Sequence, residues 1–430
     1  MTLSSPHFPR IKVRLFMVVY RVLWFVLMPL ILVYLWKRSW KEPLYWGFLH
    51  ERFGLHPQRQ SEFVWVHAIS LGEMRSATFL IDQLLAKGEK VVVTHFTPAG
   101  RAEAHRHYAQ HIRDGRLVSC WVPFDYDLAF RRFFKAFRPK YGFVMEVEFW
   151  PAMIMSSRKR KVPLFLCNGQ YPQKSWERDQ HKFLSAADIV PGFAGVMVKS
   201  ERMAVPFRTL GLKNIAVTGE LRFDQPIHDG QASAGLALRQ QHLSDRLVIV
   251  IASSIAGEDD LFIQTIKSAL SMHRDRRPFF VYVPRHPNRF EDVAHEIMQS
   301  GLSFQRRSNL VPETLGESDV ILGDSLGEMH YYLAMADRVI VGGGFVKKGS
   351  HNIIEPLLHE KPVIVGPSIW TIDFPAREAI EAGVCKMATP ETLLDVVLAD
   401  DAWPDPKPFV TSMQGGAARS LKVIQDYMQT

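Results

Sequence analysis

Cysteine is scarce in this 430-residue sequence, and its three copies, Cys120, Cys167 and Cys385, lie far apart. Three isolated cysteines cannot build a disulfide framework, and without a CxxC pair the usual zinc sites are missing too. This cysteine usage favours a reducing compartment. The sequence also lacks low-complexity tracts and repeats of fixed period, which argues against disorder, solenoids and propellers.

Several short binding signatures are missing as well. The chain contains neither GxGxxG nor GxxxxGK[ST], which argues against dinucleotide and P-loop sites. None of the strands expected below ends in a DxD-like pair, so we expect no metal ion and no separate cofactor. The basic residues are dispersed and lack interleaved aromatic side chains, which makes a nucleic-acid partner the least favoured one.

The length and the 47% hydrophobic content predict two domains, each with a sizeable core. The formal net charge of +8 would suit nucleic acid, an anionic membrane surface or a phosphate-rich substrate. Charge alone does not choose among these partners.

An apolar stretch near the N-terminus, residues 15–36, narrows the choice. It is broken only by Arg21, and a helix that crosses a bilayer needs about 20 apolar residues. Basic residues follow it in place of a small-residue cleavage site, so we expect a retained membrane anchor within residues 1–45. Because basic residues flank both sides, the orientation is not fixed; a helix in the membrane plane or a buried core helix is the alternative.

After the anchor, short apolar runs alternate with amphipathic stretches, which is typical of parallel strands joined by crossover helices. The expected strands of the first half are 64–69, 91–96, 141–145, 164–167, 195–199 and 215–218. Those of the second half are 247–252, 279–283, 320–322, 338–341 and 362–365.

The polar stretch 222–244 separates the two sets and reads as a linker that leads into a helix. We therefore expect domains at 46–228 and 229–430. Two doubly wound domains that face each other across a cleft would bind ligands at the carboxyl ends of their strands. The loops after the strands are where chemistry is expected.

The first such loop contains Ser70 and Glu73, which have the spacing of a capping box. In that structural interpretation Glu73 only completes a helix start, and the spacing alone favours it. In the functional interpretation Glu73 is a general base, which requires a partly buried carboxylate with a raised pKa.

A second pair of carboxylates, Glu146 and Glu148, stands two residues apart at the end of an expected strand. If the strand persists, both side chains lie on one face and could divide acid and base roles. Alternatively, one of them caps the following helix while the other is solvated.

In the second half, Arg285 and His286 follow an expected strand, with Arg289 nearby, and offer cations for phosphate at a strand–helix junction. A solvated basic loop is the alternative. The spacing of Ser325 and Glu328 predicts a capping box that starts another helix.

The strongest local signal is a run of three glycines, residues 342–344, directly after an expected buried strand. Gly343 and Gly344 would allow close approach of a ligand and leave N–H groups free for phosphate. His351, Asn352 and Glu355 follow. Glu355 could accept the hydroxyls of a ribose, or it could complete a capping box with Asn352.

Taken together and in this order, the motifs resemble the 3-deoxy-D-manno-octulosonic acid (Kdo) transferase family of lipopolysaccharide biosynthesis. The resemblance runs from Glu51 to Pro367, and its segments are WVHAISLGE, VVVTHFTPAG, EVEFWP, TGELRFD, PRHPNRF, DSLGEM, GGGFVKKGSHNIIEP and PVIVGP. It implies a GT-B type α/β fold with two Rossmann-like domains behind an N-terminal anchor helix. The first domain would bind the acceptor and the second the nucleotide sugar.

The resemblance also implies an activity: inverting transfer of Kdo from CMP-Kdo to a lipid A precursor, at the cytoplasmic face of the bacterial inner membrane. By the family pattern Glu73 is the general base, and Glu146 or Glu148 is the second acid. Residues of the second domain would bind the CMP donor, namely Arg285, His286, Gly343, Gly344, His351, Asn352 and Glu355.

The chain departs from the family pattern at Ser253–Ala256, at Gly169–Gln170 and at Asp373. These departures leave open a divergent relative that uses another acceptor or sugar acid. A nucleotide-sugar epimerase of the GT-B fold, which shares the architecture, is a second alternative. A membrane-tethered sugar-binding protein without catalysis is a third, non-enzymatic one.

Overall fold

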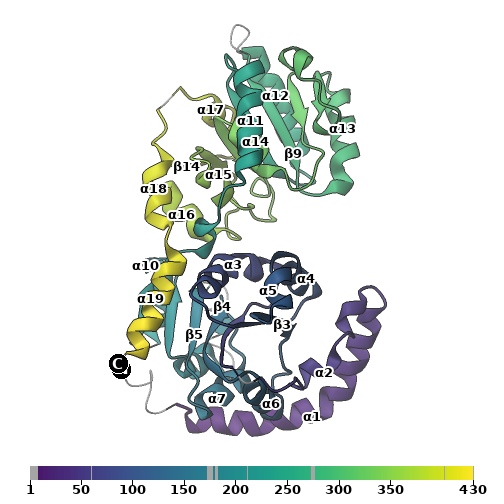
Figure 1. The fold of residues 1–430 in the computed structure, drawn as a ribbon. Helices are drawn as coiled ribbons and strands as arrows, with labels where there is room; N and C mark the ends of the chain where they lie inside the picture. Colours follow the sequence, from purple (N-terminus) through teal and green to yellow (C-terminus); the bar gives the residue numbers. More distant parts are fainter. Residues whose placement is uncertain are drawn as a thin grey trace. The chain divides into compact units, whose positions relative to one another are not determined.

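The computed structural model describes residues 8–59, 61–171, 178–179, 183–210, 212–272, 277–400 and 402–429. The chain divides into two compact units (Figure 1). Unit 1 comprises Met1–Gln225 and Gln414–Thr430, and unit 2 comprises Pro226–Met413.

Unit 1 is built on a seven-stranded sheet whose strands pair in parallel throughout, in the order β3-β2-β1-β4-β5-β6-β7. The strands are β1 (Phe63–His67), β2 (Val91–His95), β3 (Leu117–Trp121), β4 (Pro139–Met145), β5 (Leu164–Gly169), β6 (Gly195–Val198) and β7 (Ile215–Val217). The helices are α1 (Ile11–Ser39), α2 (Leu49–Arg52), α3 (Leu71–Ala86), α4 (Pro98–His107), α5 (Ala109–Arg113), α6 (Asp127–Phe137), α7 (Pro151–Lys159), α9 (Ala186–Ile189), α10 (Glu201–Thr209) and α19 (Gly416–Met428).

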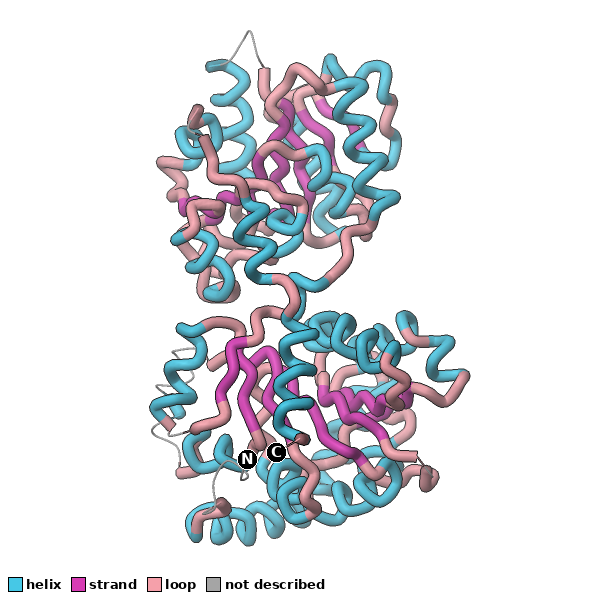
Figure 2. The backbone as a smooth tube through the Cα atoms, turned by 60° about the vertical axis from the view of Figure 1, so that its left-hand side comes forward, coloured by secondary structure: helices cyan, strands magenta, loops and turns pink. Residues whose placement is uncertain are grey.

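Unit 2 repeats this plan with a parallel sheet in the order β10-β11-β9-β8-β12-β13-β14. Figure 2 shows the strands of each unit in magenta with helices in cyan around them. The strands are β8 (Val248–Ser254), β9 (Phe279–Pro284), β10 (Phe304–Arg306), β11 (Val320–Leu322), β12 (Arg338–Val341), β13 (Val363–Val365) and β14 (Cys385–Met387). The helices are α11 (Asp229–His242), α12 (Asp259–Met272), α13 (Phe290–Gln299), α14 (Met329–Met335), α15 (Ile354–Leu358), α16 (Asp373–Glu381), α17 (Leu393–Leu398) and α18 (Pro406–Met413).

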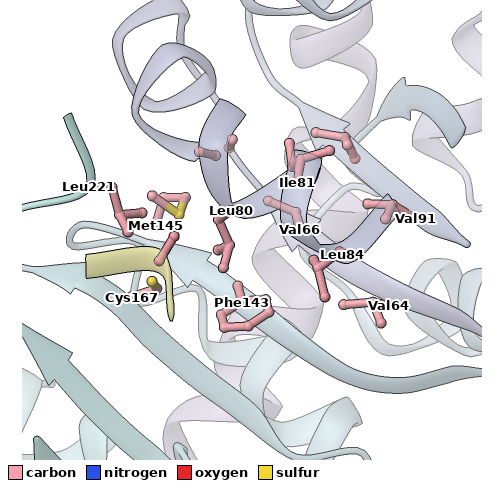
Figure 3. Close-up of a cluster of buried hydrophobic side chains, with 14 of the residues drawn as sticks. Val64, Val66, Leu80, Ile81, Leu84, Val91, Phe143, Met145, Cys167 and Leu221 are labelled. Atoms are coloured by element: carbon pink, nitrogen blue, oxygen red, sulfur yellow. The ribbon is translucent and has the colours of Figure 1, made fainter. Parts of the chain in front are cut away.

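Helices cover both faces of the sheet in unit 1, because its strands alternate their side chains between two cores. Val64 and Val66 of β1 face α3, where Leu80 and Leu84 pack (Figure 3). Trp65, between them, contacts the phenylalanines of α6 on the other face. The expectation of two Rossmann-like domains is confirmed by these parallel sheets.

Three strands were not expected from the sequence: β3, β10 and β14. All three are edge strands. An edge strand has one neighbour, so its sequence need not be a continuous apolar run. The polar strand Phe304–Arg306 illustrates this.

The C-terminal helix departs from the expected division of the chain. Residues 229–430 were expected to form one domain, but Gln414–Thr430 belongs to unit 1. Asp224 caps α19 by accepting hydrogen bonds from backbone N–H groups that include Ala417 N, at 2.7 Å. Leu421 and Ile424 then enter the core formed by α3 and the sheet. The linker is correspondingly short, and the division falls at Gln225/Pro226.

Among the described residues, α1 is the one helix long and apolar enough to cross a membrane. It runs along the outside of unit 1, past α6 and α7 (Figure 1). Three of its residues, Val13, Met17 and Leu35, are buried.

Cys120, Cys167 and Cys385 are free and buried.

Candidate active site

The order of the strands singles out one place in each sheet. In unit 1 the chain order reverses between β1 and β4, and in unit 2 between β8 and β12. Loops diverge at the carboxyl ends of such strand pairs and leave room for a ligand. Glu73 and Glu146 follow the first pair, and the glycine-rich loop follows the second.

Glu73 stands in the first turn of α3. The Ser70 hydroxyl oxygen accepts a hydrogen bond from Glu73 N at 3.3 Å and caps the helix. The Glu73 carboxylate accepts from Ile69 N at 2.8 Å and from the Ser70 hydroxyl at 3.0 Å. The cap expected from the sequence is therefore present, although the carboxylate returns to Ile69 N rather than to Ser70 N.

The same carboxyl group has the electrostatics of a base. Only 7% of Glu73 is exposed, and burial raises its pKa to about 7, with the charges of Glu146 and Glu148 adding to the effect. A carboxylate that titrates near neutral pH can take a proton from a substrate hydroxyl. The structural and functional interpretations of Glu73 are thus compatible.

Glu146 lies directly after β4 but not on a continuing strand. Its φ of 57° is left-handed, and the strand ends at Met145. The argument that Glu146 and Glu148 share a face because a strand persists is therefore wrong. Asn168 and Ser253, at the ends of β5 and β8, also have φ near 60°. Such conformations in non-glycine residues concentrate at functional sites.

Glu148 accepts a hydrogen bond from the Trp150 indole at 2.6 Å, and burial raises its pKa. It does not cap the following helix. The cap of α7 comes from Asp125, whose carboxylate accepts from Met153 N at 2.8 Å and Ala152 N at 3.2 Å. The alternative in which Glu148 or Glu146 caps α7 is therefore not what the structure shows.

A buried ionic network lies next to Glu146. Its Glu220 stands in the segment TGELRFD of the family resemblance, but no sequence pattern predicts that Glu220 pairs with Lys199. Lys199 Nζ lies 2.8 Å from the Glu220 carboxylate and 4.0 Å from that of Glu146. Gln170 bridges Lys199 and Glu146, since its side chain donates to Glu146 at 3.2 Å and accepts from Lys199 at 3.2 Å. Asn168 donates to Glu220 at 2.9 Å.

Glu220 is fully buried, so its charge depends on its partners. Burial alone would raise the Glu220 pKa, but Lys199 and Arg222 outweigh it and hold that pKa below its ordinary range. The ion pair therefore stays charged and supports the strand ends that carry Glu146. Gln170, one of the departures from the family pattern, is part of this network.

In unit 2 the glycine-rich loop after β12 is held by a carboxylate that the sequence analysis did not identify. Glu258 accepts from Gly343 N at 2.7 and 2.9 Å, from Phe345 N at 3.2 Å and from Ile255 N at 3.1 Å. The expectation that the N–H groups of the three glycines stay free for phosphate is therefore wrong for Gly343, and also for Gly342, whose N–H donates to Ala252 O at 2.9 Å. The glycines serve close packing instead: a Cβ on Gly344 would lie 2.9 Å from Gly366 N.

His351, Arg285 and His286 come together beside this loop. Gly343 faces the His351 ring, since a Cβ on Gly343 would lie 3.0 Å from His351 Nε2. Burial lowers the His351 pKa to about 4, and the charges of Arg285 and His286 add to this. His351 is therefore neutral at pH 7, while the exposed guanidinium of Arg285 supplies positive charge and the exposed His286 lies beside it. Such a group fits a phosphate.

Asn352 and Glu355 start α15 without forming a capping box. The Asn352 side chain accepts from Ile354 N at 3.0 Å. Glu355 lies in the first turn of α15, as expected. The role of Glu355 toward a ribose stays a prediction.

Other polar motifs are engaged in structural contacts. Arg289 pairs with Asp259. Ser325 contacts the Tyr332 hydroxyl at 2.6 Å, and α14 starts at Met329, so the capping box predicted for Ser325 and Glu328 is not formed. Asp373, a departure from the family pattern, pairs with Arg377 at 2.6 Å.

One DxD pair, Asp125 and Asp127, escaped the sequence analysis because it follows the unexpected strand β3. Asp125 caps α7 and accepts from the Tyr20 hydroxyl at 2.9 Å. Asp127 accepts from the Ser156 hydroxyl at 2.9 Å. Within the described residues, no group of three or more potential ligands from His, Cys, Asp and Glu comes together.

Comparison with known proteins places this site in context. A family model described as 3-deoxy-D-manno-octulosonic-acid transferase (kdotransferase) matches residues 48–225. A 3-deoxy-D-manno-octulosonic acid transferase from Bordetella pertussis is 35% identical over 418 residues, which cover 94% of this chain and 97% of the relative.

Two solved structures share the fold. A glycosyltransferase from Rickettsia africae is 10% identical with a TM-score of 0.54, and the match covers 86% of this chain and 100% of the other. A UDP-GlcNAc 2-epimerase from Neisseria meningitidis is 13% identical with a TM-score of 0.52, over 85% of this chain and 100% of the other. At such identities the likeness concerns the fold alone, and the expected GT-B class is confirmed.

Proposed function

Because the chain belongs to the 3-deoxy-D-manno-octulosonic acid (Kdo) transferase family, we propose that it transfers Kdo from CMP-Kdo to a lipid A precursor, with inversion at the anomeric carbon. The family and the Kdo-transferring glycosyltransferase activity expected from the sequence are confirmed by the comparisons. The acceptor, the donor's nucleotide and the roles of single residues belong to the proposal.

The observation that carries the proposal is the buried Glu73 carboxyl group beside two other carboxylates, with a pKa of about 7. In the proposed reaction the acceptor hydroxyl gives its proton to Glu73, and its oxygen attacks the anomeric carbon. The bond from that carbon to the phosphate oxygen breaks, and CMP leaves with the electron pair. Glu146 and Glu148 support Glu73 by raising its pKa, which makes it a stronger base.

We assign donor binding to unit 2. Departure of CMP leaves negative charge on its phosphate, and fixed cations stabilise such charge without reorganisation. Arg285 supplies such a cation beside the neutral His351, and the exposed His286 next to it can donate a hydrogen bond to the phosphate. Glu258 holds Gly343 N, and Gly343 and Gly344 pack the loop closely against His351 and Ser350, which fixes the loop beside the proposed phosphate position. Asn352 and Glu355 would hold the ribose, and no metal ion takes part.

The apolar helix α1 supports membrane association, and we propose that the enzyme works at the cytoplasmic face of the bacterial inner membrane. CMP-sugars are charged and water-soluble, whereas the proposed acceptor is a lipid. An anchored enzyme keeps close to the acceptor.

The test is transfer from CMP-Kdo, generated in situ, to a tetraacylated lipid A precursor in detergent, followed by mass spectrometry of the lipid. A mass gain of one or more Kdo units supports the proposal and counts the sugars added. An unchanged lipid, with CMP still bound by the folded protein, would refute this acceptor and turn the search to other lipids or sugar acids.

A further inference from the structure

Helix α1 contacts unit 1 along one stripe and leaves the rest of its surface bare. The stripe recurs every three or four residues, and its less exposed members are Val13, Phe16, Met17, Tyr20, Trp24, Met28, Ile31, Leu32 and Leu35. The remaining positions are mostly large apolar side chains with high exposure, such as Phe25 at 84% and Leu30 at 65%. An exposed apolar surface of this size is rare on soluble monomeric proteins and marks a site of interaction with a membrane or a protein.

Both ends of the helix, and its middle, are attached to the same unit. Lys12 pairs with Asp188 at 2.7 Å, and Tyr20 donates to Asp125 at 2.9 Å. Leu35 is buried with Tyr45 and Phe124. A helix bound along its length to one unit meets a bilayer side-on, as a helix in the membrane plane does.

A cavity of about 610 Å³ opens between α1 and the body of unit 1. Its apolar walls include Trp24, Met28, Phe53 and Leu128. The volume is in the range of about 300–1,000 Å³ that is usual for ligand sites.

Two cations line the same cavity, Arg21 and Lys159, and both are exposed. Among the described residues, neither has an ion-pair partner. The single acid there, Asp127, is already held by Ser156 at 2.9 Å and by Arg160 at 3.7 Å. The cavity thus combines an apolar interior with uncompensated positive charge.

We propose that this cavity binds one anionic glycerophospholipid of the bilayer, with an acyl chain against Trp24 and Met28 and the phosphate at Arg21 and Lys159. The inference rests on the membrane association proposed above, but not on Kdo transfer. A bound lipid would fill the space beneath α1 and connect the helix to the surrounding bilayer. The two cations select a lipid with net negative charge over a zwitterionic one.

A bilayer lipid fits the cavity better than the sugar acceptor does. The cavity is bounded by α1, α6 and the end of α7, where Lys159 lies. Glu73 starts α3, which packs on the opposite face of the sheet from α6. The proposed base is therefore on another side of unit 1.

The experiment counts lipids bound to the detergent-solubilised full chain by native mass spectrometry. The chain is titrated with phosphatidylglycerol or with phosphatidylcholine of the same acyl chains. We expect one phosphatidylglycerol to bind at least about tenfold more tightly than phosphatidylcholine, and Arg21→Ala/Lys159→Ala to remove that preference. The control, Arg14→Ala/Lys135→Ala, removes the same amount of charge from α1 and α6 outside the cavity. It should retain the preference for phosphatidylglycerol.

A filling variant tests the apolar part. Leu128→Trp should lower the affinity for both lipids, because it occupies the cavity. Equal binding of the two lipids, equal loss in both charge variants, or displacement of phosphatidylglycerol by the tetraacylated precursor would each overturn the inference. Flotation of the chain with phosphatidylglycerol vesicles is measured in parallel, so that failure of membrane association itself is recognised separately.

Discussion

A buried carboxyl group that caps a helix can still act as a base, and Glu73 combines the two tasks. Its hydrogen bond from Ile69 N fixes the side chain, while burial keeps its pKa near 7. We expect Glu73→Gln to retain CMP binding and to lose transfer by about 10²–10⁴-fold, the usual contribution of a general base. Calorimetric titration with CMP and the lipid mass assay measure the two effects. Wild-type turnover in Glu73→Gln would remove the base assignment.

The pH dependence of transfer follows from the pKa of Glu73. The base form of Glu73 is the carboxylate, so transfer should rise with pH and level off above about 7. Glu146 raises the Glu73 pKa through its charge, so Glu146→Gln should move this acidic limb to lower pH. The profile of kcat/KM for the acceptor measures the shift. Glu89→Gln, on the exposed Lys140 pair, is the control and should leave the limb in place.

Glu355 is proposed to act only on the donor side. We expect Glu355→Ala to weaken CMP binding by about tenfold, which corresponds to one lost charge-assisted hydrogen bond. The pH profile of the remaining activity should keep the wild-type limb, because Glu73 is unaffected. Calorimetry with CMP checks the first effect, and unchanged affinity would count against the ribose contact.

Single residues with a strand-end position could be found from the sequence, whereas their partners could not. Glu73, Glu146 and the glycine-rich loop follow apolar runs, so their position in a parallel sheet was predictable. Glu220 pairs with Lys199 from the next strand end, and Glu258 binds a loop 85 residues away. No local pattern predicts either pairing, because the contacts form only when the sheet is complete.

At the scale of elements, the loop after β12 depends on Glu258. Its carboxylate accepts hydrogen bonds from Gly343 N and Phe345 N. Without Glu258 these N–H groups would lack these partners, unless the loop changed its conformation. Glu258→Ala should lower the free energy of unfolding of unit 2 by about 2–3 kcal/mol. Hydrogen exchange of the 342–345 amides should become faster, with weaker CMP binding. Glu381→Ala, an exposed acid on α16, serves as the control. Unchanged exchange would show that the loop holds itself.

The interior strands were predicted from the sequence, whereas three of the four described edge strands, β3, β10 and β14, were not; β7 is the edge strand that was predicted. A strand between two neighbours is buried on both faces and reads as a run such as Val248–Ile251, whereas β10 and β14 are short and partly polar. The capping box predicted at Ser325 is absent for a related reason. The Ser325 side chain contacts Tyr332, and the Glu328 side chain accepts a hydrogen bond from Arg307.

At the scale of the whole molecule, unit 1 is complete only when the C-terminal helix α19 packs against it. Residues 414–430 lie nearly 200 positions from the Asp224 carboxylate that caps α19, and no local sequence pattern marks that return. Composition and length could predict two units, but not that one of them is made of two separate segments.

Leu421 makes this return testable. It is 3% exposed, in the core formed by α3 and the sheet. Because truncation of a buried leucine leaves a cavity, Leu421→Ala should lower the free energy of unfolding of unit 1 by about 2–5 kcal/mol. Hydrogen exchange should accelerate in α3 and β1, while β8 and β12 keep their protection. Lys422→Ala, the exposed neighbour on the same helix, should change neither. Acceleration in β8 and β12 but not in α3 would mean that α19 stabilises unit 2 and would contradict this division of the chain.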